Sequence, residues 1–223
     1  MPGETTFKHT RYLLELRELN FSSGLRNKDF KGADLSQADF HGMMVVGVNF
    51  ENARLDGLNL YDCEIVNCSF RGADATRAIF KKARLLNCLF DSSNLSQSDF
   101  GEAIVYNARI DNCDLHLCRF NGARVIDSFI TKSSFLGSDL TGAFFNDVEF
   151  YTSNLQNLNA DRTVIIKCKL VDSRLDRIAF KHALIYDTAV ESCGAEGMVL
   201  MDTKTDLDME ALRGARAIDV KRV

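Results

Sequence analysis

The sequence A-D-L-S-Q at positions 33–37 is followed at once by A-D-F-H-G at 38–42, and the pattern returns as S-D-F-G-E at 98–102 and S-D-L-T-G at 138–142. In register with these segments, every fifth residue from position 25 to position 200 is apolar, which makes 36 consecutive positions. An α-helix repeats every 3.6 residues and a flat strand every two, so neither predicts a period of five. The pattern indicates a tandem repeat, and this repeat decides the fold.

Two other positions of the repeat are restricted. The residue two places before the central one is Ala, Ser, Cys or Thr in 28 of the 36 repeats, and nine of the fourteen glycines lie two places after it. A large and a small inward residue, followed by a turn residue, describe a short straight segment that ends in a corner. Four such segments close a square, so we expect one coil for every 20 residues and nine coils in all.

The four walls of this square can be followed through the sequence at intervals of 20 residues. The first wall has largely β-branched centres, the second and fourth are rich in Phe, and the third consists mostly of Leu. Ladders of like side chains are the contacts on which solenoid proteins rely. The lone proline, Pro2, lies outside the repeats, where it removes no hydrogen bond between coils.

The quoted segments resemble the pentapeptide-repeat family, whose consensus is A-(D/N)-L-x-x, and the resemblance covers residues 23–202. It implies an all-β solenoid, a right-handed quadrilateral parallel β-helix whose central and minus-two residues point inward. Residues 1–22 and 203–223 are then end segments that cap the coils. We expect a short amphipathic helix over 10–20, and a C-terminal helix that begins at Thr205, with Asp208 at capping-box spacing, and stops at Gly214.

The C-terminal segment is also a candidate dimer contact. In several family members this segment forms the dimer, so the resemblance favours a homodimer here, with a monomeric cap as the alternative. The candidate dimer residues are Leu207, Met209 and Leu212.

The composition restricts the classes of function. The formal net charge is −4, which excludes a strongly basic protein that binds nucleic acid directly. The chain holds no run of 18 uncharged apolar residues, and its first residues contain no unbroken apolar stretch, so we expect neither a membrane span nor a secretory signal. The odd number of cysteines, seven, favours a reducing compartment, and we expect a cytoplasmic protein.

The residues that could carry chemistry are better explained by packing. All seven cysteines occupy the minus-two position, where a small apolar residue is needed. Cys63 and Cys68 lack the CxxC spacing and the histidine partners of a zinc site, and the four histidines are scattered. The glycines are corner residues and do not form a phosphate loop. We therefore expect no catalytic residue, no cofactor and no metal, and a protein that is not an enzyme.

The outer surface must then carry the function. Summed over each whole wall with its corner, the outward charge is 0 on the first wall, −2 on the second, −2 on the third and −1 on the fourth. Some pentapeptide-repeat proteins bind DNA gyrase or topoisomerase IV and protect it from quinolones, which requires a surface as acidic as DNA. The resemblance therefore implies a DNA-mimicking topoisomerase binder that confers resistance, but the weak and mixed charge argues against it.

The neutral first wall differs from the others because it carries a stripe of large apolar residues on its outside. Such a stripe favours an interface with a protein partner of unknown identity, although β-propensity or cover by a chain end would also explain it. A corner row of Asn and Asp runs beside it, from Asn27 to Asp187. We predict a non-enzymatic protein-binding or scaffold module, with the topoisomerase binder as the alternative. The candidate partner-binding residues are Met44, Val46, Val66, Leu86, Ile104, Tyr106, Ile126, Phe144, Val164, Ile166, Leu184 and Tyr186.

Overall fold

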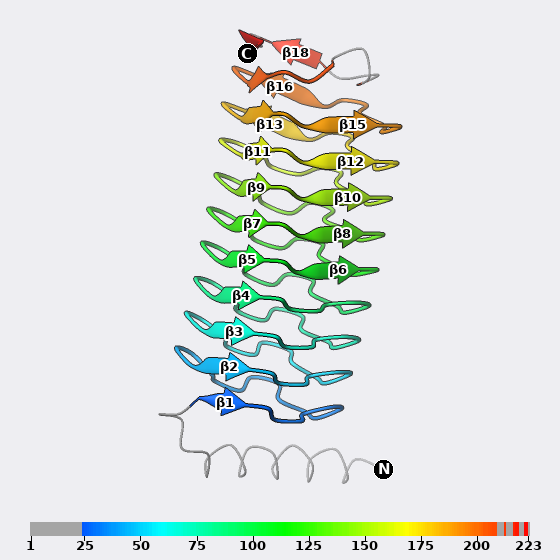
Figure 1. The fold of residues 1–223 in the computed structure, drawn as a ribbon. Coiled ribbons are helices and arrows are strands. Elements are labelled where there is room, and N and C mark those ends of the chain that lie inside the picture. The colour runs from blue at the N-terminus through cyan, green and yellow to red at the C-terminus, as the bar shows by residue number, and fades with distance from the viewer. Residues whose placement is uncertain (1–23, 209–211, 213–215, 219–220, 223) are drawn as a thin grey trace.

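The computed structural model describes residues 24–208, 212, 216–218 and 221–222, and these form a single column of stacked coils (Figure 1). The predicted spacing is confirmed between residues 25 and 205, because strands there pair in parallel 20 residues apart, as in Leu25 with Val45 and Leu85 with Val105. The fold is thus a β-solenoid of about nine turns. The expected helix over 10–20 lies outside the described residues.

The first wall is one continuous sheet of short parallel strands, ordered along the column as the chain visits them. Its strands are β1 (Leu25–Arg26), β2 (Met44–Val46), β3 (Glu64–Val66), β4 (Arg84–Leu86), β5 (Ile104–Tyr106), β7 (Arg124–Ile126), β9 (Phe144–Asn146), β11 (Val164–Ile166), β14 (Leu184–Tyr186), β17 (Lys204–Thr205) and β19 (Lys221–Arg222).

The second and fourth walls become regular sheets only in the later coils, and single parallel bridges connect the earlier ones. The third wall is held by such bridges throughout, for example between Asp34 and Arg54. The strands of the second wall are β6 (Arg109–Asp111), β8 (Phe129–Thr131), β10 (Glu149–Tyr151), β12 (Lys169–Val171) and β15 (Ala189–Glu191). Those of the fourth wall are β13 (Ala179–Lys181), β16 (Val199–Met201) and β18 (Arg216–Ile218).

The corners have one backbone feature in common: the residue two places after each centre has a positive φ at all 36 corners, and at 27 of them it is not glycine. Many corners are closed by a turn hydrogen bond, such as the Ala33 amide to the Phe30 carbonyl at 2.9 Å. The Asp or Asn of the repeat supports the turn, because the carboxylate of Asp34 accepts the Ser36 amide at 3.1 Å. This contact gives the recurring Asp or Asn of the motif a structural role.

Phenylalanine rings stack inside the column on two walls. On the second wall Phe50, Phe70 and Phe90 stack with centroid distances of 4.9 Å, and on the fourth wall Phe100 stacks on Phe80 at 4.7 Å. Their side chains are almost completely buried, so ladders of like rings form part of the core. Lys28, which the repeat places inward, is exposed in the first coil.

The C-terminal helix expected from Thr205 onward is wrong for the residues that the structure describes. Thr205 lies in β17, which pairs with β14 at the usual spacing of 20 residues. The following strands pair at a spacing of 17 instead, as in Leu200 with Ala217 and Lys204 with Lys221. Pairing with the preceding coil satisfies the backbone of this segment, so tertiary contacts override the local capping pattern.

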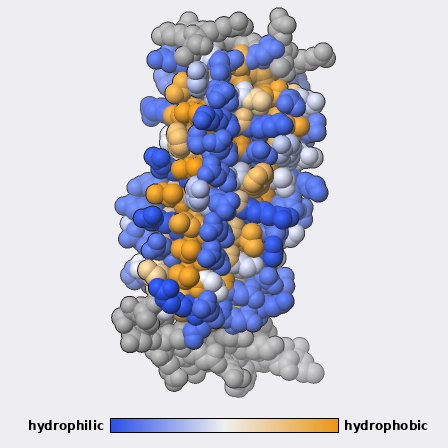
Figure 2. Space-filling model, in the orientation of Figure 1, coloured by the Kyte–Doolittle hydropathy of each residue, from blue (hydrophilic) through white to orange (hydrophobic). Residues whose placement is uncertain are grey.

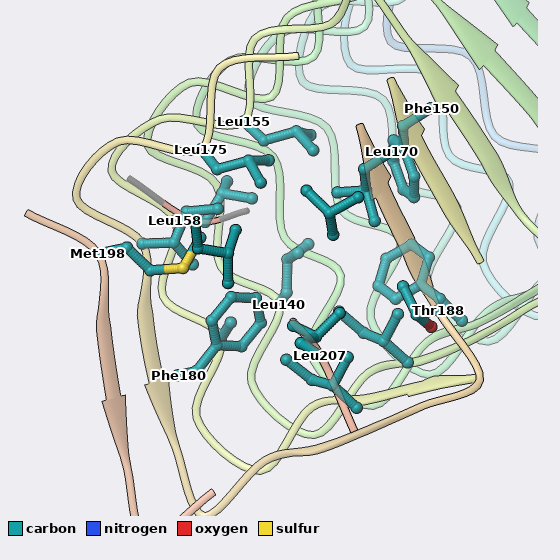
Figure 3. Close-up of a pocket in the computed structure, with 17 residues that line it drawn as sticks. Leu140, Phe150, Leu155, Leu158, Leu170, Leu175, Phe180, Thr188, Met198 and Leu207 are labelled. Carbon is teal, nitrogen blue, oxygen red and sulfur yellow. The ribbon is translucent and has the colours of Figure 1, made fainter. Parts of the chain in front are cut away.

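Leu207 and Leu212 close the end of the core. Both are buried, and with residues of the last coils they line an apolar cavity of about 40 Å³ beneath them (Figure 3). Their side chains face the column's own interior, which gives both residues a role in the packing of this end; the contact with a second copy stays a prediction. Met209 lies outside the described residues.

Candidate functional site

The outward rows of the first wall form the candidate site. Each strand of this wall buries its central residue and turns the residues on either side outward, because side chains alternate along a strand. In β3, for example, Ile65 is fully buried between Glu64 and Val66. All twelve predicted partner-binding residues occupy these two rows, on β2, β3, β4, β5, β7, β9, β11 and β14, and all are partly or fully exposed.

The row that follows the buried centres is the more continuous of the two. Strand register places Val46, Val66, Leu86, Tyr106 and Ile126 next to one another on five consecutive strands. Figure 2 shows hydrophobic residues gathered in bands along the column, with hydrophilic residues between them.

Beyond Ile126, Asn146 interrupts this row, which resumes with Ile166 and Tyr186. The row that precedes the centres is apolar mainly in the later coils, where Phe144, Val164 and Leu184 are neighbours. We call the twelve residues together the apolar stripe.

Charged side chains interrupt the stripe in the earlier coils. In the row that precedes the buried centres, Glu64 and Arg84 come after Met44, and Arg124 comes after Ile104. The guanidinium group of Arg124 lies 5.0 Å from the centre of the Phe144 ring, in a cation–π contact. Sequence reasoning did not count these arginines as part of the site, although their position beside the buried centres was readable from the repeat.

The corner row beside the stripe is partly a hydrogen-bonded ladder. The side-chain amide of Asn87 donates to Asn67 at 2.9 Å, and that of Asn107 donates to Asn87 at 2.9 Å. Above them Asp127 accepts a hydrogen bond from Tyr106, which raises the pKa of that phenol. The Asn members therefore have a structural role, and the ladder forms a polar border to the stripe.

A shallow hollow of about 290 Å³ opens at the corner between the fourth and first walls. Two acids and two bases from neighbouring coils line it, together with Met44 at one end of the stripe. Its lining residues are Gly42, Met43, Met44, Asp62, Cys63, Glu64, Lys82 and Arg84.

The seven cysteines are buried and unpaired, as their place in the repeat predicts. Their thiols can donate hydrogen bonds to buried backbone carbonyls, as serine hydroxyls do in other repeats. Cys63 donates to the Phe40 carbonyl at 2.9 Å, and Ser98 donates to the Ala75 carbonyl at 2.8 Å. Burial raises the pKa of Cys63 and of Cys68 to about 11, which keeps both thiols protonated at neutral pH.

Three histidines pair with carboxylates at separate places on the column. The His182 ring nitrogen lies 3.0 Å from Asp161, and this hydrogen bond lowers the pKa of the carboxyl group. His41 pairs with Asp39, and His116 with Asp114. Within the described part of the chain, no three His, Cys, Asp or Glu side chains come close enough together to hold a metal ion. In that part, too, no helix has the length and apolar character to cross a membrane.

Several surface acids on the other walls are paired with bases one coil away. Arg54 binds Asp34 at 2.8 Å, and Arg77 binds Asp56 at 2.7 Å. On the second wall Asp91 lies between Arg71 and Arg109, at 2.9 Å from each. Pairing of this kind reduces the negative potential of these walls.

Comparison with family models identifies the repeats. A model described as "Pentapeptide repeat region" matches residues 44–120, and one described as "Pentapeptide repeats (8 copies)" matches residues 25–52 and 118–157. Together the matches extend from residue 25 to residue 157, which is more than half of the 223-residue chain. No curated protein matches the sequence.

Solved structures include similar columns. One is HetL, a pentapeptide repeat protein involved in heterocyst differentiation regulation from the cyanobacterium Nostoc sp. strain PCC 7120. It is 13% identical, with a TM-score of 0.68 over 94% of this chain and 92% of that one. Another is a trypsin-treated form of QnrB1, a plasmid-mediated fluoroquinolone resistance protein, which is 16% identical, with a TM-score of 0.52 over 90% of each chain. At these identities the likeness concerns the fold alone.

Proposed function

This chain belongs to the pentapeptide-repeat family, and from that premise we propose that it is a non-enzymatic scaffold that binds a protein partner through the apolar stripe of its first wall. Pentapeptide-repeat proteins are generally scaffolds without enzymatic activity. The observation that carries the proposal is the gathering of twelve large apolar residues on the two outward rows of one wall.

The exposure of the stripe supports this role. Tyr106 and Tyr186 are 42% and 45% exposed, and Met44 is 38% exposed. Aromatic and methionine side chains are enriched in the centres of protein interfaces, where their burial contributes most of the binding energy. A concentration of exposed apolar residues on a wall that does not need them for its own core is typical of a binding surface.

The test replaces three neighbours in the stripe with threonine, a smaller, polar and β-branched residue that suits a strand. Val66→Thr, Leu86→Thr and Tyr106→Thr are combined in one protein. We expect loss of the proteins captured by the parent from cells of the source organism, with an unchanged unfolding midpoint.

The matched control carries Tyr61→Thr, Ile79→Thr and Leu136→Thr, which are 36 to 39% exposed on other walls. This control should capture the same proteins as the parent. If the stripe variant still captures them, or if the control loses them too, the stripe is not the binding surface.

A second candidate function is binding to DNA gyrase or topoisomerase IV as a DNA mimic, which the likeness in fold to QnrB1 favours. The pairing of Asp34, Asp56 and Asp91 with arginines weighs against it, since a DNA mimic needs unpaired negative charge to occupy the basic DNA-binding groove of the enzyme. A gyrase supercoiling assay with and without ciprofloxacin separates the two. Protection or inhibition at micromolar protein would support the mimic, and the absence of both would remove it.

A further inference from the structure

The first wall differs from the other three in charge when only its outward strand rows are counted and its corner residues are left out. Between residues 24 and 200, its two outward rows hold three basic residues, Arg26, Arg84 and Arg124, against one acid, Glu64. The corresponding rows hold 4 basic and 6 acidic residues on the second wall, 2 basic and 6 acidic on the third, and 3 basic and 4 acidic on the fourth. The apolar wall is therefore the one positively charged wall of a protein whose net charge is −4.

The acids that balance this charge lie to one side, on the corner row. Asp127, Asp147 and Asp187 occupy that row with Lys167. They belong to the polar border described above, which runs along one side of the strand rows, so a partner that lies on the rows themselves meets the arginines.

Arg84 and Arg124 are available to a partner. Both side chains are exposed, and within the described part of the chain neither takes part in an ion pair. Arg54 and Arg77, on other corners and walls, are held by aspartates. The guanidinium group of Arg124 rests on an aromatic ring, which orients it without neutralising it.

The spacing of these arginines is set by the strands. Arg84, Ile104 and Arg124 lie side by side on β4, β5 and β7, so two strand separations, about 9.6 Å, divide the arginines. Leu86, Tyr106 and Ile126 run in the parallel row beside them. The result is a positive–apolar–positive pattern next to a continuous apolar row.

A helix is the element that fits such a surface. The backbone groups of the wall are used in bonds between coils, so the wall offers a partner only side chains, and the partner must satisfy its own backbone. An α-helix does so, its diameter of about 10 Å matches a wall one short strand wide, and its residues i and i+7 lie about 10.5 Å apart along its axis.

We propose that the first wall docks an acidic amphipathic helix of a partner protein, lying along the column. Acidic residues at i and i+7 would face Arg84 and Arg124, and apolar residues at i+3 and i+4 would pack on Ile104 and Tyr106. This inference rests on the proposed function. A second copy of the chain is a poorer occupant, because its first wall carries the same positive charge.

The test is a selection from a displayed library of a helical scaffold with randomised surface positions, panned against the full chain. The selected helices should carry an apolar face with acids seven residues apart, and their Kd should rise at least tenfold for Arg84→Glu/Arg124→Glu. Panning against that variant should select basic residues at the same two places. The matched control, Arg119→Glu/Lys181→Glu, makes the same change in net charge on the fourth wall and should bind like the parent.

The results distinguish this inference from the proposed function. Pools without acidic enrichment, identical pools from parent and reversed variant, or no enriched helix at all would overturn the inference. If the enriched helices ignore the arginines but are lost with the threonine variant of Val66, Leu86 and Tyr106, the stripe still binds and only the acidic partner is wrong. If they bind that threonine variant as well, the stripe itself is excluded.

Discussion

Phe70 is the residue at which the contribution of ring stacking can be measured most directly. It is completely buried, stacks on Phe50 and Phe90 at 4.9 Å, and meets Phe80 edge-on at 5.9 Å with an interplanar angle of 79°. Each aromatic pair contributes about 0.5 to 1.5 kcal/mol beyond the area that it buries. Phe70→Leu keeps most of the apolar area but removes three pairs, so we expect the free energy of unfolding to fall by about 2 to 4 kcal/mol.

The comparison is Phe145→Leu, a residue equally buried on the first wall that meets one ring, Phe150, at 5.9 Å and 56°. Its loss should be about 0.5 to 1.5 kcal/mol by the same reasoning. Urea unfolding followed by circular dichroism gives both values, provided that the transition slopes agree with the parent. Equal losses for the two variants would refute the view that stacking, rather than burial alone, stabilises the ladder.

Two further predictions concern the corners and the thiols. Thr152 has a φ of +51°, which is strained for a β-branched residue, so Thr152→Gly should raise the free energy of unfolding by about 1 kcal/mol. Gly32 has a φ of +66° and open space around it, so Gly32→Ala should lower the free energy of unfolding. Denaturant unfolding that shows the reverse signs would contradict this strain. Buried Cys63 and Cys68 hold their protons to about pH 11 while unfolded thiols release theirs near pH 9, so stability should be insensitive to these thiols below pH 9 and fall between pH 9 and 11. Alkaline unfolding of Cys63→Ala/Cys68→Ala should be less steep than that of the parent, and an identical pH profile would show that these thiols titrate normally.

The period of five was sufficient to predict the column, because it specifies which residues face inward without any knowledge of neighbours. Leu85 and Val105 had to be stacked once four segments made a coil, and the structure pairs them. The inward place of the cysteines followed from the same register. Long-range order in a solenoid is encoded locally, which is why so much of this fold could be predicted.

The structure of the C-terminal end and the backbone conformation of the corner residues could not be predicted from the period of five. Thr205 belongs to a local pattern typical of a helix start, yet pairing with the preceding coil places it in a strand. Leu117 and Thr152 have positive φ although neither residue favours it, since the register of the walls imposes the corner on whichever residue stands there. In both cases a tertiary constraint overrides a local preference.

The candidate site was predicted in position but not in charge. Its twelve apolar residues lie where the repeat placed them, on the outward rows of the first wall. The sum over a whole wall, however, combined Arg84 and Arg124 with Asp127 and Asp147, which the structure puts on a separate corner row. The repeat already places these aspartates two residues after the buried centres, so counting the corner row apart from the strand rows distinguishes a positive wall from a negative border.

Between residues 25 and 205 the 20-residue register divides the distance along the column into equal steps. Two side chains on one wall can be separated only by whole numbers of strand spacings, each about 4.8 Å, so the gap between Arg84 and Arg124 is two units and cannot be adjusted by small insertions. Duplicating one complete coil between them would lengthen the gap to three units without disturbing the core or the corners. In this architecture the distance between two binding residues on one wall can change only in steps of a whole coil.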